Sequence, residues 1–228
     1  MKSFLGGYQS MTNYILETKI IKPLSENKPK HIIVLCHGYG GDGQDISMLA
    51  INWQRFLPDA IFFCPNGPEV CSVNPSGFQW FNLSTEQDDK ILENSITAEE
   101  KLISYLDQIL NNYNLDSHNL ALVGFSQGCM ISIQAALKNK QKINCVIGYS
   151  GKVINQKYLS ENINSKPKIF LMHGDNDTIV PPMHLLEAKE YFSKCGIKIK
   201  TKLFKNCEHR IPVEGVSLGL DFLRKNLL

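Results

Sequence analysis

One hexapeptide, Val123-Gly124-Phe125-Ser126-Gln127-Gly128, constrains the fold of this chain more than any other segment. It follows a short apolar run and precedes a stretch with helical periodicity from about Cys129, which predicts a strand, a sharp turn and a helix. A serine in so tight a turn needs neighbours without Cβ atoms, and the glycines on either side satisfy that need. The same spacing also arises in ordinary Gly/Ser-rich turns. The rest of the chain must therefore decide between a nucleophile and a plain turn.

Further apolar runs predict a mostly parallel sheet. Continuous runs are typical of strands that are buried on both faces, and stretches with helical periodicity separate them. This alternation predicts one α/β domain, a doubly wound central sheet with helices on both faces. The expected strands are Ile15 to Lys22 at an edge, Ile32 to Cys36, Ala60 to Cys64, Leu120 to Val123, Ile143 to Ile147, Ile169 to Met172 and Ile197 to Phe204. The expected helices are Gln44 to Phe56, a stretch around Leu102 to Tyr113, one after Ser126, one ending near Cys195 and one over Val213 to Leu227.

Length and composition fit a single domain. With 228 residues, of which 43% are hydrophobic, the chain can bury one large core. We expect a disordered N-terminal segment over residues 1–14 and one folded domain over residues 15–228. The formal charge of +2 is dispersed along the chain, which argues against a nucleic-acid partner.

Cysteine usage and hydropathy predict a cytoplasmic protein. The seven cysteines form no C-x-x-C pair, and their odd number favours a reducing compartment. Residues 1–10 lack the apolar region of a secretory leader, and no apolar stretch approaches the roughly 18 residues of a membrane span. We therefore expect no integral membrane association. The oligomeric state stays open between monomer and homodimer.

A glycine-rich loop, His37 to Gly43, follows the predicted strand that ends at Cys36. Such a loop lets backbone amides approach a ligand closely. A phosphate-binding loop would need a lysine followed by serine or threonine, and neither follows at that spacing. The alternative is an oxyanion loop, in which the amides of Tyr39 and Gln127 hold a developing negative charge.

The segment from Glu69 to Asn82 shows no regular period and contains several apolar side chains. It either covers the core or forms one apolar wall of a substrate pocket. We favour the wall because the segment follows the carboxyl end of a strand. The predicted substrate-binding residues are Val70, Val73, Phe78 and Trp80.

The remaining catalytic candidates lie on loops that follow later strands. A base must be oriented by an acid, and the expected chain order is Ser, Asp, His. Asp177 is the predicted acid, because Asp175 is better placed to accept backbone amides of its own turn. His209 is the predicted base, since His184 follows a Pro-Pro helix start that is typical of a surface position. Predicted strand ends place Ser126, Asp177, His209 and the glycine loop at one edge of the sheet.

Other serine and histidine residues have structural interpretations. Ser150 lacks the glycine spacing of the hexapeptide and is expected to serve its turn. His37 is expected to brace the glycine loop and His173 a strand end, while His31 and His118 are expected at the surface.

Four ordered motifs, H-G-Y-G-G-D-G, G-F-S-Q-G, H-G-D-N-D-T-I-V-P and C-E-H-R-I-P, resemble the phospholipase/carboxylesterase family of the α/β-hydrolases, which includes the acyl-protein thioesterases. The resemblance spans about residues 15–226. It implies the α/β-hydrolase fold and hydrolysis of esters or thioesters without a cofactor. Three positions depart from the family pattern: Cys129 replaces a second glycine, Tyr39 a common leucine and Asn82 the aspartate of W-F-D.

The sequence therefore predicts a serine hydrolase that forms an acyl-enzyme on Ser126. No metal is expected, because no His/Cys/carboxylate set has ligand spacing. With one apolar wall and no long insertion between Gly148 and Lys168, short to medium acyl chains are expected. A lysophospholipase or acyl-protein thioesterase is the alternative, acting on a lipid or protein substrate. A non-catalytic binding member of the fold would not need all three of Ser126, Asp177 and His209.

Overall fold

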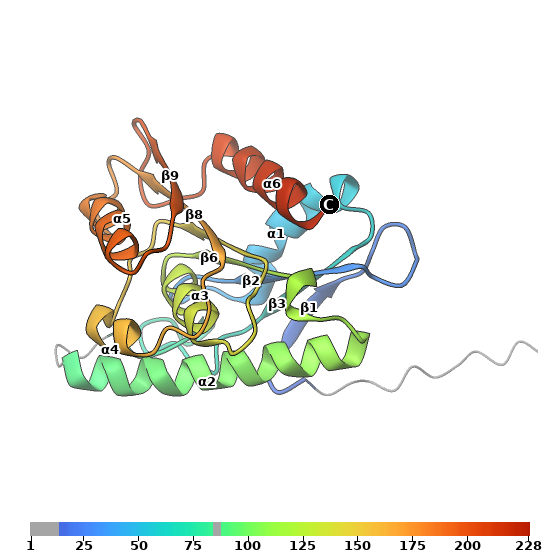
Figure 1. Cartoon of the computed structure of the whole chain (residues 1–228), viewed down its shortest axis with the longest axis horizontal. Coiled ribbons are helices and arrows are strands. Elements are labelled where there is room, and N and C mark those ends of the chain that lie inside the picture. The colour runs from blue at the N-terminus through green and yellow to red at the C-terminus, as the bar shows by residue number, and fades with distance from the viewer. Residues whose placement is uncertain (1–13, 84–87) are drawn as a thin grey trace, which may run out of the picture.

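The computed structural model of the chain describes residues 14–83 and 88–228. All but the last residue of the segment predicted to be disordered, residues 1–14, lies outside this range. Seven strands form one sheet in the order β1-β3-β2-β6-β7-β8-β9 (Figure 1). Only β1 runs antiparallel to its neighbour, so the prediction of a mostly parallel sheet is confirmed. The strands are β1 (Thr18–Ile21), β2 (His31–Cys36), β3 (Ala60–Pro65), β6 (Leu120–Phe125), β7 (Cys145–Tyr149), β8 (Lys168–Gly174) and β9 (Ile199–Phe204).

Helices connect the parallel strands, as right-handed crossovers between parallel neighbours require. They are α1 (Gly43–Trp53), α2 (Asp88–Tyr113), α3 (Gln127–Lys138), α4 (Gln156–Glu161), α5 (Met183–Lys194) and α6 (Val213–Leu227), with two 3₁₀ turns, η1 (Gln54–Phe56) and η2 (Ser117–Asn119). The carboxylate of Asp42 caps α1 by accepting a hydrogen bond from the amide of Asp45 (2.8 Å).

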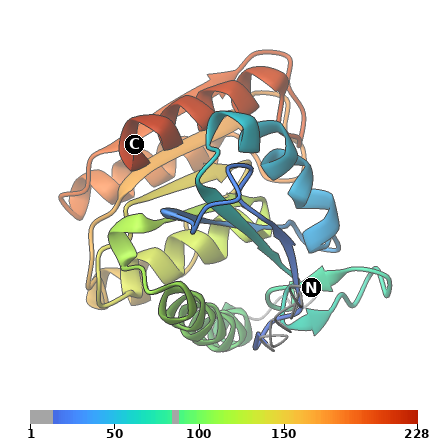
Figure 2. The same ribbon diagram turned by 90° about the vertical axis from the view of Figure 1, so that its right-hand side faces the viewer.

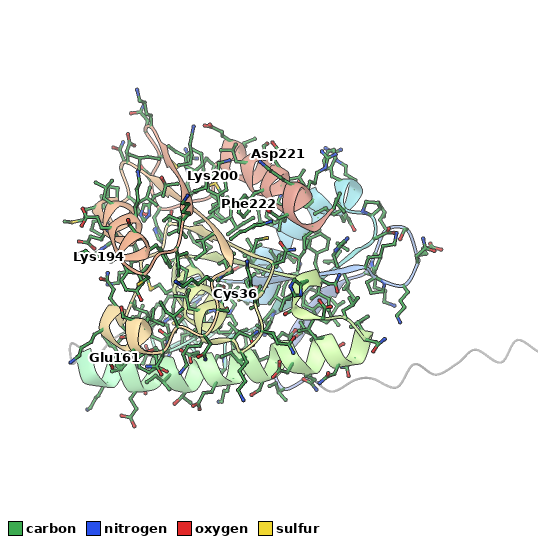
Figure 3. All side chains as sticks on the ribbon, viewed as in Figure 1. Cys36, Glu161, Lys194, Lys200, Asp221 and Phe222 are labelled. Carbon is green, nitrogen blue, oxygen red and sulfur yellow. The ribbon has the colours of Figure 1, made fainter. Side chains whose placement is uncertain are left out.

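Two apolar layers enclose the sheet. Alternate side chains of each central strand point to opposite faces, so Ile33 packs with α1 and α6, whereas Ile32 packs with α2 and α3. Figure 2 shows α1 and α6 on one side of the sheet and α2 and α3 on the other. In Figure 3 the side chain of Cys36 lies in the interior, while Glu161, Lys194 and Asp221 lie at the periphery. The prediction of helices on both faces is confirmed.

The parallel register brings the loops of interest together. Cys36, the last residue of β2, pairs with Gly124 of β6, so the glycine loop leaves the sheet beside the hexapeptide. Gly174 at the end of β8 pairs with Phe204 of β9, so the two later loops also lie side by side. Carboxyl ends of parallel strands share one edge of a sheet, and all four loops start there.

The structure differs from the sequence prediction in several elements. The edge strand covers only Thr18–Ile21, and α2 begins at Asp88, well before the apolar stripe from which it was predicted. The segment Glu69 to Asn82, for which no regular structure was expected, contains a small hairpin of β4 (Glu69–Val70) and β5 (Phe78–Gln79). Two-residue strands are too short to leave a period in the sequence. The short helix α4 was not predicted either.

Candidate active site

The turn that carries Ser126 is strained and tightly packed. Ser126 has φ 53°, a left-handed conformation that is uncommon for a residue with a Cβ atom. A Cβ atom at Gly124 would clash with the carbonyl of Gly128, and one at Gly128 would clash with the carbonyl of Cys36. The spacing of the two glycines is therefore imposed by backbone contacts. The turn is closed by a hydrogen bond from the Ser126 amide to the Tyr149 carbonyl (2.8 Å).

The structure brings together the three side chains that the sequence singled out. The hydroxyl of Ser126 lies 3.0 Å from Nε2 of His209, and Nδ1 of His209 lies 2.7 Å from Oδ2 of Asp177. A carboxylate can only accept, so Nδ1 carries the proton and Nε2 is free to accept from the serine. Each residue comes from a different strand end, of β6, β8 and β9. The arrangement can abstract a proton from the serine hydroxyl.

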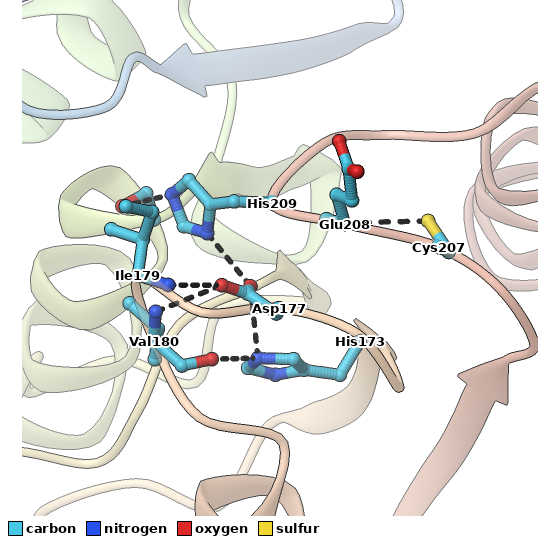
Figure 4. A network of polar contacts seen from close by, with 8 residues as sticks. His173, Asp177, Ile179, Val180, Cys207, Glu208 and His209 are labelled. Atoms are coloured by element: carbon cyan, nitrogen blue, oxygen red, sulfur yellow. Dashed lines mark hydrogen bonds and ion pairs between the residues drawn. The ribbon is translucent and has the colours of Figure 1, made fainter.

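The carboxylate of Asp177 is held on every side (Figure 4). Its Oδ1 accepts hydrogen bonds from the amides of Ile179 (2.9 Å) and Val180 (2.8 Å). Burial raises the pKa of this carboxyl, but the hydrogen bonds from His209, Val180 and Ile179 outweigh that effect and leave the pKa below its ordinary value. The group is therefore an anion that is fixed in place and faces the imidazole.

The rejected candidates occupy structural positions. Asp175 accepts a hydrogen bond from the amide of Cys207 (3.3 Å) and so links the loops after β8 and β9. His184 pairs with Glu187 on α5 (2.7 Å between Nδ1 and Oε2). His37 accepts from the amide of Gly67 through Nε2 (2.8 Å), and its Nδ1 donates to the carbonyl of Gly38 (2.7 Å). The prediction that His37 braces the glycine loop is thus confirmed.

Backbone amides at the glycine loop and at the start of α3 lie at the edge that carries Ser126. The amides of Gly40 and Gly41 donate to Phe78 and Gly38, respectively, whereas no hydrogen bond within the described residues occupies the amide of Tyr39. Gln127 is the first residue of α3, where helical amides have no partner within the helix. A nascent oxyanion beside Ser126 could be stabilised by these two donors.

The side chain of Gln127 clamps a neighbouring segment. It is fully buried, its Oε1 accepts from the amide of Trp80 (2.9 Å), and its Nε2 donates to the carbonyl of Phe81 (2.6 Å). The indole of Trp80 in turn donates to the carbonyl of His37 (3.0 Å). Hence the turn at Ser126, the glycine loop and the segment 80–81 form one hydrogen-bonded unit.

The four residues predicted to form a substrate wall are dispersed. Trp80 is only 1% exposed and lies in the core, as the alternative interpretation of this segment held. Val70 and Val73 are exposed on the hairpin, and Phe78 is half-buried in β5. None of the four lines any of the three best-defined cavities within the described residues. A role of Val70, Val73 and Phe78 in substrate binding stays a prediction.

A cavity that the sequence did not reveal lies between the first turns of α2, the loop after β7, α4 and the start of α5. Its volume is about 650 Å³, and its apolar lining comprises Leu83, Ile91, Leu92, Val153, Ile154 and Tyr158. Two of its walls are connected to the turn at Ser126. Gly151 packs against that turn just before the wall formed by Val153 and Ile154, and a Cβ atom there would lie 3.0 Å from the carbonyl oxygen of Ser126.

The second wall starts at Leu83, two residues after Phe81. The carbonyl of Phe81 accepts the hydrogen bond from the side chain of Gln127. In the sequence, the signal for this cavity is the apolar pair Val153-Ile154, which stands just after a strand in an otherwise polar loop. Within the described ranges, no group of three or more His, Cys, Asp or Glu side chains is placed to hold a metal ion. Nor does any helix of residues 14–83 and 88–228 combine the length and apolar character needed to cross a membrane.

Comparison with known proteins gives a consistent result. The family model described as phospholipase/carboxylesterase matches residues 18–227. The chain is 24% identical to esterase YpfH of Escherichia coli over 201 residues, which cover 88% of this chain and 85% of the esterase. It is 27% identical to acyl-protein thioesterase 1 of Kluyveromyces lactis over 221 residues, covering 91% and 97% of the two chains.

Solved structures agree with this relationship. The crystal structure of esterase PE8 superposes with a TM-score of 0.88 at 32% identity, covering 93% of this chain and 99% of that one. The Arabidopsis thaliana protein SOBER1 shares the fold, with a TM-score of 0.77 at 17% identity over 87% and 99% of the two chains. The fold is thus the α/β-hydrolase fold, and the family match covers nearly the whole described chain. The chain belongs to the phospholipase/carboxylesterase family and is a carboxylic ester hydrolase.

Proposed function

We propose that this hydrolase cleaves esters of short to medium acyl chains through an acyl-enzyme on Ser126. The observation that carries the proposal is the hydrogen-bonded line from Ser126 through His209 to Asp177. A partly apolar cavity begins two residues after Gly151, which packs against the Ser126 turn. Each of the three groups has the partner that its role requires: a base for the nucleophile and a fixed anion for the base.

In the first half-reaction the Ser126 oxygen attacks the acyl carbonyl while Nε2 of His209 takes the hydroxyl proton. The amides of Tyr39 and Gln127 hold the resulting oxyanion. When the tetrahedral intermediate collapses, the bond to the leaving oxygen breaks, and His209 returns the proton to that oxygen. Asp177 stabilises the imidazolium throughout.

In the second half-reaction a water molecule attacks the acyl-enzyme. His209 accepts one proton from the water and then gives it to the departing Ser126 oxygen, which releases the carboxylic acid. The side chains described above take up and return every proton in both half-reactions, so we propose no metal and no cofactor.

The acyl chain occupies the cavity lined by Ile91, Val153 and Ile154. Each methylene that enters such a lining contributes about 0.8 kcal/mol, so kcat/KM rises with acyl length until the cavity is filled. The cavity also has seven polar lining residues, which restrict the space that an alkyl chain can use: Lys152, Asn155, Gln156, Lys157, Glu161, His184 and Glu187. This limit favours short to medium chains over long ones.

The experiment is a series of p-nitrophenyl esters from acetate to palmitate, measured as kcat/KM. Ile154→Trp should move the optimum to shorter chains and Ile154→Ala to longer ones. Phe78→Ala is the matched comparison, because it alters the wall first predicted from the sequence. An optimum that responds to Phe78→Ala and not to either Ile154 variant would place the acyl chain at the hairpin instead.

A thioesterase or lysophospholipase is the second candidate. The similarity to acyl-protein thioesterase 1 of Kluyveromyces lactis covers almost all of that protein and favours this alternative. Parallel assays with matched octanoyl oxygen esters and thioesters, and with a lysophospholipid, distinguish the substrate classes. A kcat/KM that is much higher for the thioester or the lysophospholipid would overturn the preference for simple esters.

We also propose a cytoplasmic location. All seven cysteines are free thiols, and six of them are buried, where a reducing compartment preserves them. Fractionation of cells that express the tagged protein tests this. Recovery in a secreted or a membrane fraction would contradict it.

A further inference from the structure

A second histidine contacts the acid of the catalytic group. His173 lies near the end of β8 and is 1% exposed, and within the described residues it forms no hydrogen bond with Ser126 or His209. Its Nε2 lies 2.8 Å from the carbonyl oxygen of Val180 and 3.2 Å from Oδ2 of Asp177 (Figure 4). That Oδ2 is the atom that accepts the hydrogen bond from His209.

The proton on His173 can be placed from these contacts. A carbonyl oxygen can only accept, so Nε2 of His173 carries a proton and donates it to Val180. The same N–H group faces Asp177 Oδ2 as a second, longer contact. Burial lowers the pKa of His173, and the positive charges of protonated His209 and His184 lower it further. The carbonyl of Val180 and the carboxylate of Asp177 raise this pKa, but the net shift is downward. The imidazole of His173 is therefore uncharged at neutral pH.

The carboxylate of Asp177 consequently has four neighbours that carry a donor. Two amides hold Oδ1, and the imidazoles of His173 and His209 meet at Oδ2. A buried carboxylate without such partners would rotate or take up a proton. Because His173 faces the oxygen that His209 uses, it opposes rotation of the carboxylate away from His209.

We propose that His173 is a positioning residue for the reaction at Ser126: its neutral Nε2–H keeps Asp177 Oδ2 directed at His209. The inference rests on the proposed function, since it concerns the orientation of the proposed base. It goes beyond bracing of a strand end, which would require only the bond to Val180.

The test compares His173→Met, which fills similar space without a donor, with His173→Gln, whose amide can donate from nearly the same place. Removing the donor should lower kcat by up to about a hundredfold with little change in KM, the size of effect that misplacement by an ångström produces. The carboxylate, with one donor fewer, attracts the imidazole proton more strongly. The acidic limb of the kcat profile should therefore move to higher pH in His173→Met and return in His173→Gln.

Several charged groups near His173 and His209 also affect the pH profile of kcat. Asp177, His209 and His184 act on His173, Glu187 pairs with His184, and Glu208 and Arg210 flank His209. These groups are unchanged in both variants, so a difference between Met and Gln at position 173 reports the donor. Melting temperatures of both variants identify any loss of fold.

The outcomes separate this inference from the proposed function. Labelling of wild-type Ser126 by a fluorophosphonate tests the latter alone, and without labelling both proposals fall. If wild-type Ser126 is labelled and His173→Met keeps the wild-type kcat and acidic limb, only the positioning role is overturned. It is also overturned if His173→Met loses activity without a shift of the limb, or if folded His173→Gln restores neither. Should His173→Met not fold, wild-type-like activity of His173→Gln with an unshifted limb supports the role, and an inactive folded His173→Gln refutes it.

Discussion

Asp177 and Asp175 are two residues apart, yet their carboxylates serve different loops: Asp177 Oδ2 lies 2.7 Å from His209, and Asp175 Oδ1 lies 3.3 Å from the amide of Cys207. Both partners belong to the segment after β9. The carboxylate of Asp177 thus faces the imidazole of His209, and the carboxylate of Asp175 fixes the loop on which His209 lies.

This division predicts different effects of two matched substitutions. Asp177→Asn should lower kcat roughly ten-thousandfold, because an amide donor opposite Nδ1 favours the wrong imidazole tautomer. Asp175→Asn keeps an acceptor for Cys207 and should leave kcat nearly unchanged, with a small loss of melting temperature. Rates and melting curves of both variants check the assignment. A well-folded but inactive Asp175→Asn would reverse it.

Ser126→Ala should abolish turnover. In serine hydrolases, loss of the nucleophile costs on the order of a millionfold in kcat. The measurement is steady-state turnover together with intact mass after fluorophosphonate treatment. Ser150 provides the control, because it also has a left-handed backbone (φ 48°) at a strand end but lacks the flanking glycine spacing. Label that persists in Ser126→Ala, or that is lost in Ser150→Ala, would contradict the assignment.

Glu99 predicts a pH-dependent stability that is independent of the active site. Its side chain is buried in α2, and burial raises its pKa from 4.5 to about 7, against the opposing effects of Gln134 and Lys138. Between these pH values the folded state binds more protons than the unfolded state. The free energy of unfolding should therefore fall as pH rises through this window, by at most roughly 1.4 kcal/mol per pH unit.

Urea unfolding between pH 4.5 and pH 8 measures this slope. Glu99→Gln should remove the contribution, whereas Glu100→Gln, an exposed neighbour on the same helix, should retain it. Equal slopes for wild type and Glu99→Gln would show that the pKa of Glu99 is the same in the folded and unfolded states, and would contradict the prediction.

Cys129 and Gly151 should be energetically coupled. A Cβ atom at Gly151 would lie 2.5 Å from both Cβ and Sγ of Cys129, so Gly151→Ala should destabilise the fold by about 1–3 kcal/mol. Cys129→Gly removes both atoms and should relieve part of that loss. A double-mutant cycle should give a coupling of roughly 1 kcal/mol, while Cys145→Ala in place of Cys129→Gly should be additive. Additivity of Gly151→Ala and Cys129→Gly would mean that the loop after β7 moves away from Cys129 when the Cβ atom is added.

The central strands and the three catalytic candidates could be predicted because local patterns encode them. Continuous apolar runs such as Ile32 to Cys36 indicate strands buried on both faces, and β2 covers that run with one further residue. The glycines beside Ser126 satisfy a backbone requirement that is local to the turn. Chain order then left few candidates for the acid and the base.

The cavity proposed for the acyl chain could not be predicted in the same way, because its lining comes from segments that only the tertiary fold brings together. Leu83 and Ile154 are 71 positions apart in the numbering, and neither stands in a periodic pattern. Trp80 is the converse case. Its apolar character favours a pocket wall in the sequence, whereas in the structure it packs in the core and forms hydrogen bonds with Gln127 and His37.

The order of the strands along the chain also has a consequence for biosynthesis. The glycine loop follows β2 and Ser126 follows β6, and these two strands pair at the centre of the sheet. Asp177 and His209 follow β8 and β9, which the ribosome makes later. A nascent chain therefore carries its serine well before the groups that make it reactive. Under the proposed mechanism, activity is therefore expected only after β9 and the loop with His209 have been made and have packed against the sheet.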